Sequence, residues 1–425
     1  MRFYNFIFST AVIVCAGYGY SYAEDPQASI PVLSRSFDDF SPIGFRLSTF
    51  NLFPTIDTSV EYTSNTLKTD ADEESERLYR ARAGVTAQST SGRFKTLFTG
   101  HAERLDYQKT DGFDQTNFRL SAKTDYTLSP VAELSGQVEM ERKHQTRYES
   151  GTINAAFDPI QIDEFGFITA LSLNPGPIRW GITGEYKDTS HKDTIFHTNG
   201  ATLVQSDRDR SSYSLGLKAA FEEYSTQSDV GFTPFMGLNM TRTVYDNRDF
   251  NTTTNSFSGV EQSNTNYNLS GGFDMKSGGK LRGLVSVGYG LSNPDDKSLE
   301  TQSSGIVDID LTYLYSPLTN FIFGVERFFT NDTDSSDSTL ETRLSAKVVH
   351  ELTRQWILNS GIAYVKREYG GNIEDDAVEG NIGFIHRINK RFSVNGDVKY
   401  ISRESNQQNG DYDETRAMIR LRTKF

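Results

Sequence analysis

Hydrophobic and polar residues alternate with a period of two in the last stretch of the chain, from Tyr412 to Phe425. Counted backwards from Phe425, every second residue is apolar or neutral, and most of the residues between them are cations. This pattern is typical of a β-strand that lies between an apolar medium and water. A final edge strand of a soluble sheet would look similar, so the segment alone favours a membrane barrel and the rest of the chain has to decide.

The same alternation recurs from Asn51 onward, in segments of about ten to fifteen residues that end in turns. Short and long connections alternate along the chain. Those at 89–92 and 128–130 are short, whereas the loop that runs to about Asp207 is long. Short periplasmic turns and long extracellular loops produce this second alternation. We count eighteen segments, an even number that places both chain ends on the periplasmic side. Strand boundaries carry an uncertainty of about 2–4 residues, so 16 or 20 strands would also fit.

The predicted fold is therefore all-β, a single transmembrane antiparallel barrel of about 18 strands with short periplasmic turns and longer extracellular loops. An array of secreted β-sandwich domains is the structural alternative. Open sheets rarely exceed about 10 strands, and separate sandwiches would need linkers, which are not evident between Asn51 and Phe425. Within this scheme Pro234 is expected to mark a bulge or a strand end, because proline removes a ladder hydrogen bond.

The first 23 residues have the features of a secretory signal peptide. Arg2 precedes a short apolar run, and Ser21 and Ala23 form a small-x-small cleavage site. The expected organisation is a signal peptide at 1–23, a periplasmic N-terminal lead-in at 24–49 and the barrel at 50–425. The only cysteine, Cys15, lies inside the signal, which excludes disulfides and cysteine-bound metal from the mature chain.

Composition agrees with a chain placed in the cell outer membrane. No apolar stretch of about 18 residues follows the signal, so no transmembrane helix is expected. The net charge of −13 argues against nucleic acid as a partner. Aromatic residues make up 12% of a chain whose mean hydropathy is −0.52, which fits a barrel with a wet interior and an aromatic rim. Outer-membrane lipids and lipopolysaccharide are the expected surroundings.

Motifs at the start of the predicted barrel resemble the opening of the putative β-barrel porin 2 family. They read PIGFRL at 42–47, FNLFP at 50–54 and EYTSN at 61–65. Later Tyr-Asp pairs, at 245–246 and 412–413, and the final aromatic residue are similar too. The resemblance covers nearly the whole mature chain. It implies an outer-membrane barrel of a kind often associated with exopolysaccharide loci, with polysaccharide as a partner to be exported, and it supplies no catalytic residues.

The aromatic carboxyl terminus, Phe425, resembles the signal that the barrel-assembly machinery reads in outer-membrane proteins. That machinery is therefore an expected partner. Deletion of Phe425 is expected to impair membrane insertion far more than deletion of a loop tip such as Asp334.

Charged residues are expected on the inner faces of the predicted strands. The candidate pore-lining residues are Arg80, Arg82, Lys399, Arg403, Arg416, Arg420, Arg422, Glu133, Glu139, Glu141, Asp308 and Asp310. If cations and carboxylates occupy opposite walls, they impose a transverse field that selects polar or anionic solutes. The other interpretation is that these side chains pair across strands and only solvate the interior.

The sequence shows no motif for catalysis, and neither a cofactor nor a metal is expected. His191 and His197 form only a weak pair in a loop, and Asp332, Asp334 and Asp337 fit an acidic extracellular loop better than a Ca²⁺ site. No G-x-S-x-G motif is present. A porin-like channel or conduit for sugars or exopolysaccharide is the leading hypothesis. A surface or structural barrel without an open pore and an outer-membrane enzyme are the alternatives, and the chain is not expected to be an enzyme.

Overall fold

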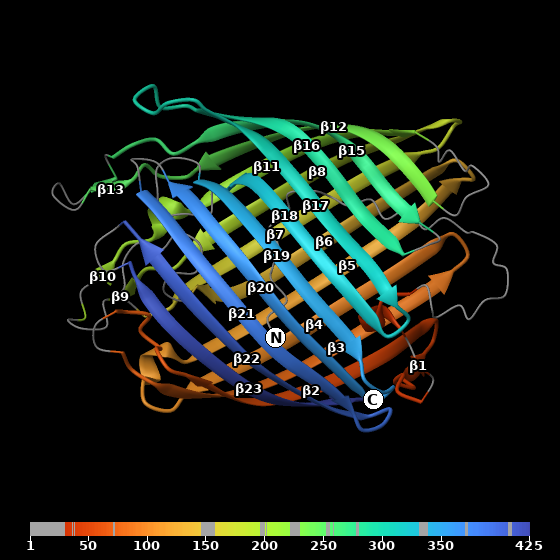
Figure 1. The fold of residues 1–425 in the computed structure, drawn as a ribbon. Helices are drawn as coiled ribbons and strands as arrows, with labels where there is room; N and C mark the ends of the chain where they lie inside the picture. Colours follow the sequence, from red (N-terminus) through yellow and green to blue (C-terminus); the bar gives the residue numbers. More distant parts are fainter. Residues whose placement is uncertain are drawn as a thin grey trace.

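The computed structural model shows a closed β-barrel whose strands run obliquely around a central axis (Figure 1). The structure describes residues 30–35, 37, 39–70, 73–145, 158–195, 200, 202–221, 230–251, 256–257, 259–277, 280–330, 339–369, 373–406 and 410–425. In this part of the chain nearly all regular structure is extended, as the period-two alternation predicts.

The wall is a sheet of 19 strands, in which the three-residue strand β1 (Phe45–Leu47) pairs only with β2. The remaining 18 strands make up the barrel. They are β2 (Phe50–Thr63), β3 (Glu76–Ser91), β4 (Phe94–Tyr107), β5 (Gln115–Ser129), β6 (Ala132–Gln145), β7 (Ile160–Leu173), β8 (Ile178–His191), β11 (Arg210–Phe221), β12 (Val230–Tyr245), β15 (Asn264–Ser277), β16 (Leu281–Pro294), β17 (Gln302–Ser316), β18 (Thr319–Thr330), β19 (Thr339–Glu351), β20 (Trp356–Tyr369), β21 (Ile373–Arg387), β22 (Phe392–Ser405) and β23 (Tyr412–Lys424).

Each barrel strand pairs antiparallel with the next one along the chain, and the first pairs with the last. Strand β2 meets β23 from Thr55 opposite Lys424 to Thr63 opposite Arg416. This pairing closes the sheet, so the wall has no free edge. The predicted single antiparallel barrel of 18 strands is confirmed.

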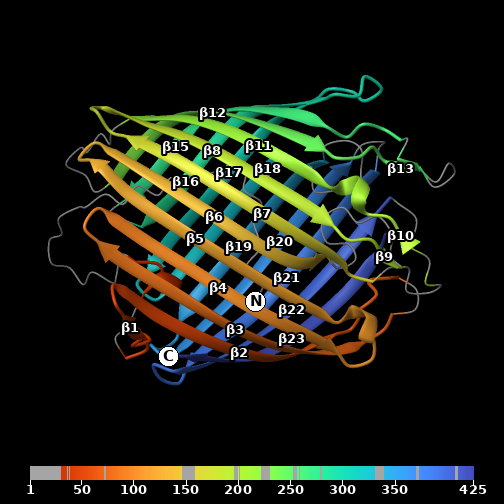
Figure 2. The same cartoon turned by 180° about the vertical axis from the view of Figure 1, so that it is seen from behind.

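The two ends of the barrel differ in the length of their connections. Turns such as 92–93, 130–131 and 317–318 join strands at one end, which we call the short-turn end. Loops such as 108–114 and 246–263 join them at the other, the long-loop end. Strand β1 and the C-terminus lie at the short-turn end, opposite the loop hairpins (Figures 1 and 2).

The loops and the N-terminal segment contain short strands and 3₁₀ helices. Two-residue strands form the hairpins β9 (Thr194–Ile195) with β10 (Thr202–Leu203) and β13 (Phe250–Asn251) with β14 (Ser256–Phe257). Three single-turn 3₁₀ helices are η1 (Val32–Ser34), η2 (Asp111–Phe113) and η3 (Ser206–Arg208). Among the described residues, no helix has the length and apolar character that crossing a membrane would require.

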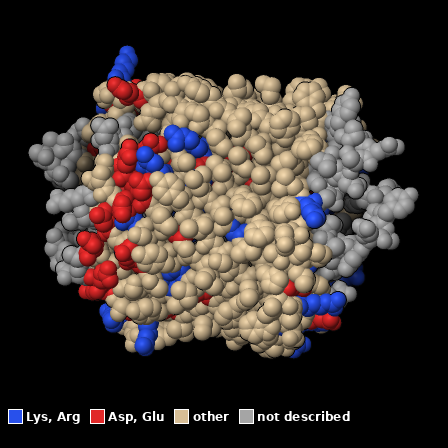
Figure 3. Space-filling view, viewed as in Figure 1, with Lys and Arg blue, Asp and Glu red and all other residues tan. Residues whose placement is uncertain are grey.

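The outer face of the wall is apolar. Side chains such as Ile382, Ile419 and Ile362 are 59–69% exposed, as are other large apolar residues at outward positions near the middle of the barrel strands. In Figure 3 the central part of the visible surface is almost free of charge, and Asp and Glu residues gather in a band toward the long-loop end. An apolar band between charged ends matches a wall that contacts lipid.

One expectation from the sequence is wrong: Pro234 neither ends β12 nor produces a bulge. The strand continues through it, with Pro234 opposite Phe273 of β15 and no shift of register. Pairing of β12 with β11 ends one residue later, at Phe235 opposite Ala220. Proline is tolerated where a strand pairs on one side only, because its missing N–H then removes no ladder bond on the other side.

Two glycines, on β15 and β16, lie where the backbone of a neighbouring strand approaches closely. A Cβ atom added to Gly283 would clash with the backbone of Asp310, and one added to Gly272 would clash with the backbone of Val285. Gly283 also has a φ angle of +138°, a conformation that side chains disfavour.

We therefore expect Gly283→Ala to lower the stability of the barrel by at least about 1 kcal/mol, since alanine tolerates neither the φ angle nor the close contact. The urea concentration at which heat-modifiable migration is lost measures the effect. Gly380→Ala is the matched control, because nothing lies within 4 Å of a Cβ at that position. Equal midpoints for the two variants would show that the φ angle and the close contact at Gly283 do not require glycine.

Candidate functional site

The inner wall of the barrel carries most of the charged side chains of the strands. On β23, Arg420 and Met418 are buried on the inner face, while their neighbours Ile419 and Leu421 are exposed on the outer face. Side chains alternate between the two faces of a strand, so each strand with an apolar outer row presents a polar inner row. A solute inside the barrel would meet this inner row first, which makes it the candidate site.

Ion pairs connect inward side chains of adjacent or next-but-one strands at many points of one sector, from β19 through β23 and β2 to β8. At its centre Arg422 donates two hydrogen bonds, of 2.7 and 2.9 Å, to the carboxylate of Asp57. The other pairs are Arg80 with Glu61 (3.0 Å), Arg367 with Glu341 (2.9 Å), Arg343 and Lys399 with Glu379 (3.3 and 3.2 Å), Arg119 with Glu139 (2.7 Å), and Lys143 and Lys187 with Glu164 (both 3.0 Å). We call this sector the ion-pair belt.

The most deeply buried pair of the ion-pair belt joins Arg403 of β22 to Asp375 of β21. Their side chains are 5% and 2% exposed, and the hydroxyl of Tyr369 donates to the same carboxylate at 2.6 Å. A charged pair removed from water is stable only when its partners are in place. Arg403 and Asp375 therefore depend on each other at the long-loop end of the wall.

The twelve residues predicted from the sequence all occupy inward positions in the strand register. Six of them belong to ion pairs: Arg80, Arg403, Arg416, Arg422, Lys399 and Glu139. The guanidinium of Arg420 contacts the Sδ atom of Met418 at 3.2 Å. Among the described residues, no ion-pair partner lies within 4.0 Å of Arg82, Glu133, Asp308 or Asp310. Glu141 interacts with its charged neighbours on the belt.

Cations and carboxylates thus share the same sector instead of facing each other across the lumen. For the paired residues the geometry agrees with the interpretation in which side chains pair across strands. Whether any of the twelve residues contacts a permeating solute stays a prediction.

The opposite sector, β11 to β17, presents mainly hydroxyl, amide and glycine positions to the interior. Ser214 and Thr241 share a hydrogen bond of 2.9 Å, and Thr241 donates to Asn239 at 3.1 Å. Charged side chains are sparser here and include Lys218, Asp274, Arg282, Asp308 and Asp310. The lumen therefore has one densely paired charged side and one largely neutral polar side.

The described N-terminal segment, residues 30–35 and 37, lies against the inner wall at the short-turn end. Val32 is 1% exposed and packs with Val349 of β19 and Ile357 of β20, which are equally buried. Beside them Arg35 pairs with Glu351 at 3.1 Å, and both side chains are at most 5% exposed.

Further along the same segment, Phe37 is held by two cations of the wall. The guanidinium carbons of Arg354 and Arg387 each lie 5.6 Å from the centre of its ring. Such cation–π contacts contribute about 0.5–1 kcal/mol each when exposed. Sequence reasoning placed 24–49 as a lead-in to the barrel and found none of these contacts, because Val32, Arg35 and Phe37 follow no periodic pattern.

The loop residues considered as metal ligands do not form a site in the described part of the chain. His191, at the end of β8, contacts the carboxylate of Asp209 through Nδ1 at 3.3 Å. His197 and the segment 331–338 lie outside the described residues. Within the described residues, no three His, Cys, Asp or Glu side chains are arranged to hold a metal ion.

Carboxylates in the described long loops lie close enough together to affect each other. Burial, helped by the nearby carboxylates of Asp207 and Glu261, raises the pKa of Asp249 to about 6. Burial also raises the pKa of Asp207. The long-loop end is therefore an environment of crowded negative charge.

The closed wall and its inner row occur in a chain that matches a known protein family. The family model described as "Putative beta-barrel porin 2" matches residues 38–425. The chain belongs to this family. The suspected resemblance is confirmed, and the porin 2 barrel described here is an outer-membrane β-barrel of the porin type. A search among curated proteins found no significant match.

Solved barrels resemble this porin 2 barrel only distantly. The outer membrane protein opdK from Pseudomonas aeruginosa has 9% identity and a TM-score of 0.45, with 88% of this chain and 99% of that chain covered. The FrpB iron transporter from Neisseria meningitidis has 9% identity and a TM-score of 0.48, with 85% and 62% covered. The ferric citrate transporter FecA has 7% identity and a TM-score of 0.46, with 88% and 78% covered.

The buried pair at the long-loop end gives a test of the ion-pair belt. Asp375→Asn removes the negative charge that pairs with the buried Arg403 guanidinium, so the porin 2 barrel should lose about 3–5 kcal/mol of stability. Unfolding in urea, followed by tryptophan fluorescence and heat-modifiable migration, gives the value.

Arg104→Gln serves as the control, because Arg104 is 47% exposed and pairs with Asp106 and Asp114 on the outer surface. Exposed pairs contribute only about 0.2–1 kcal/mol. A loss for Asp375→Asn as small as that for the control would mean that water reaches the Arg403–Asp375 pair.

Proposed function

We propose that this porin 2 barrel is an outer-membrane channel through which sugars or an exopolysaccharide pass. The observation that carries the proposal is the closed wall of 18 strands with a polar, charged inner row. Barrels of about 16–18 strands are wide enough to leave an aqueous channel. Hydroxyl and amide groups on the β11–β17 side offer hydrogen-bond partners to sugar hydroxyls, and the family is one of porins.

A second function, a surface barrel without an open pore, is favoured by one specific observation. The N-terminal segment occupies part of the interior at the short-turn end, held by Val32 and Arg35. A segment fixed there narrows the passage. In the channel proposal it sets the width of the periplasmic opening, and in the alternative it contributes to a closed plug.

The proposal includes the route of the chain to the membrane. Residues 1–23 act as a secretory signal, and the barrel-assembly machinery then inserts the barrel among outer-membrane lipids and lipopolysaccharide. Phe425, whose backbone N–H donates to the carbonyl of Pro54 at 3.1 Å, is the proposed assembly signal.

Conductance in planar lipid bilayers separates the two functions, and the N-terminal segment provides the decisive variant. Val32→Asp places a carboxylate among Val349 and Ile357, at a cost of several kcal/mol for an unpaired buried charge. The segment should then leave the wall, and single-channel conductance should rise above that of the parent.

Leu33→Asp is the matched control, since Leu33 is 38% exposed and its substitution leaves the segment docked. A conducting parent whose conductance is unchanged in Val32→Asp would place the segment outside the path of ions. A parent without conductance that opens in Val32→Asp would favour the plugged barrel, and the absence of conductance in both would contradict the channel.

A further inference from the structure

Inward-facing cations gather at the short-turn end of the barrel, apart from the ion-pair belt. Each lies within four residues of the end of its strand at this end of the barrel. We call this set the basic mouth: Lys95, Arg179, Lys218, Arg282, Lys347 and Lys424. With a rise of about 3.3 Å per residue along a tilted strand, the set forms a ring close to the opening.

The cations of the basic mouth differ from those of the belt in their surroundings. Among the described residues, no carboxylate lies within 4.0 Å of Lys95, Arg179, Arg282, Lys347 or Lys424. The Nε atom of Arg282 is buried without a hydrogen-bond partner in this part of the chain.

Few carboxylates offset these cations at the same level of the wall. Asp125 is paired with Lys123 at 3.6 Å, and Glu351 is paired with Arg35 of the N-terminal segment. Among the described inward residues within four positions of a strand end, this leaves Glu133 and Asp274 beside the mouth cations, and farther inside Asp308 interacts with Lys218. Within the described residues cations still outnumber carboxylates at the opening.

The connections between strands also differ in charge between the two ends of the barrel. The described short turns carry Arg93, Lys280, Arg354, Lys390 and Arg391 and no carboxylate. The remaining connection at that end, 222–229, lies outside the described residues and contains Glu222, Glu223 and Asp229 in its sequence. The described long-loop residues outside the strands contain 16 carboxylates and 6 cations. Over its described residues the barrel thus has a positive end and a negative end along its axis.

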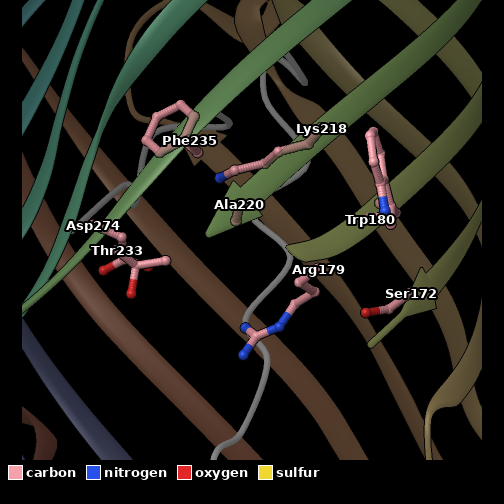
Figure 4. Close-up of a pocket in the computed structure, with 9 residues that line it drawn as sticks. Ser172, Arg179, Trp180, Lys218, Ala220, Thr233, Phe235 and Asp274 are labelled. Carbon is pink, nitrogen blue, oxygen red and sulfur yellow. The ribbon is translucent and has the colours of Figure 1, made fainter. Parts of the chain in front are cut away.

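Two cations of the basic mouth line a small cavity on the β7–β15 side. Arg179 of β8 and Lys218 of β11 extend into the same space as Thr233 and Asp274, while Trp180 points away (Figure 4). The ammonium of Lys218 lies 4.0 Å from the centre of the Phe235 ring. The cavity has a volume of about 40 Å³, room for about three water-sized groups. A space of this size beside two cations suits a carboxylate or phosphate substituent.

We infer that the basic mouth captures anionic glycans from the periplasmic side, with Arg179 and Lys218 binding the acidic substituent of one sugar unit. The inference rests on the proposed channel function and specifies its substrate class and its preferred side. Arg179 offers a planar fork that matches a carboxylate or phosphate in two-point contact. A funnel of one sign raises the local concentration of an oppositely charged ligand.

The negatively charged loops at the long-loop end repel an anionic chain. Carboxylates such as Asp249, Asp207 and Glu261 lower the concentration of an anionic chain at the outer opening and favour its release once it has emerged. A static field drives no net transport, so the source of the polymer in the periplasm supplies the direction. The field decides which side captures the chain.

The test measures capture of a defined probe from each side of single channels in a planar bilayer. The probes are a hexameric oligouronate, its neutral counterpart maltohexaose, and inorganic phosphate. The oligouronate should interrupt the current at least about tenfold more often from the short-turn side than from the long-loop side, because steering by charge changes association rates by about 10–10³. Maltohexaose should show no preference of this size, and phosphate alone should compete only weakly.

The double variant Arg179→Gln, Lys218→Gln should reduce oligouronate capture from the short-turn side about tenfold, since it removes two of the charges that steer the anionic probe and steering changes association rates by about 10–10³. Its reversal potential in a KCl gradient should shift toward cations. The charge-preserving variant Arg179→Lys, Lys218→Arg should retain the side preference. Arg104→Gln, Lys366→Gln removes two cations from the outer face and should behave as the parent.

If the first double variant does not insert, Lys95→Gln, Lys347→Gln tests the same ring without altering the cavity and should also weaken capture. Equal capture from both sides, or unchanged capture after removal of the mouth cations, would overturn the inference while the barrel remained a sugar channel. A parent that conducts neither ions nor either oligosaccharide would instead refute the proposed function.

Discussion

Closure of the sheet is the constraint on which the rest of the structure depends. In lipid an unpaired backbone N–H or C=O costs several kcal/mol, so a strand wall is stable there only without free edges. The pairing of β2 with β23 removes the last two edges, over the register from Thr55–Lys424 to Thr63–Arg416. The same seam brings Asp57 beside Arg422. It also brings Thr63 beside Glu414, and the hydroxyl of Thr63 donates a hydrogen bond of 2.6 Å to the carboxylate of Glu414. Backbone closure and side-chain pairing therefore reinforce each other at the seam.

Inside the closed wall, the surroundings of the cations differ between the two ends of the barrel. Near the long-loop end most cations have a carboxylate partner, and buried examples such as Arg403 with Asp375 would be unstable alone. At the short-turn end cations such as Arg179 and Lys347 lack such partners among the described residues. The two ends of the interior therefore differ in whether a described carboxylate compensates the charge of a cation. A buried cation without such a partner lowers stability, as the unsatisfied Nε atom of Arg282 illustrates.

The sequence predicts the barrel well because one strong periodic signal, alternation of apolar and polar residues, determines both strands and faces. Inward positions such as Arg420 could be identified from the pattern alone. The partners could not, because they depend on the stagger between strands: Arg80 meets Glu61 of the neighbouring strand only in the observed register. The prediction for Pro234 was wrong because the effect of proline depends on where pairing with β11 ends. The docked residues Val32 and Arg35 lie in an irregular segment that offers no pattern to read.

The N-terminal segment also bears on the order in which the molecule is assembled. Arg35 and Glu351 are 316 residues apart in the chain, and the pocket for Val32 is formed by β19 and β20, near the end of the sequence. The first described residues therefore have no binding site until β19 and β20 are in place. Contacts of such long sequence separation form late, because the entropy of closing the intervening loop must be overcome first. Docking of the N-terminal segment is thus a marker of a barrel in which β19 and β20 have already assembled.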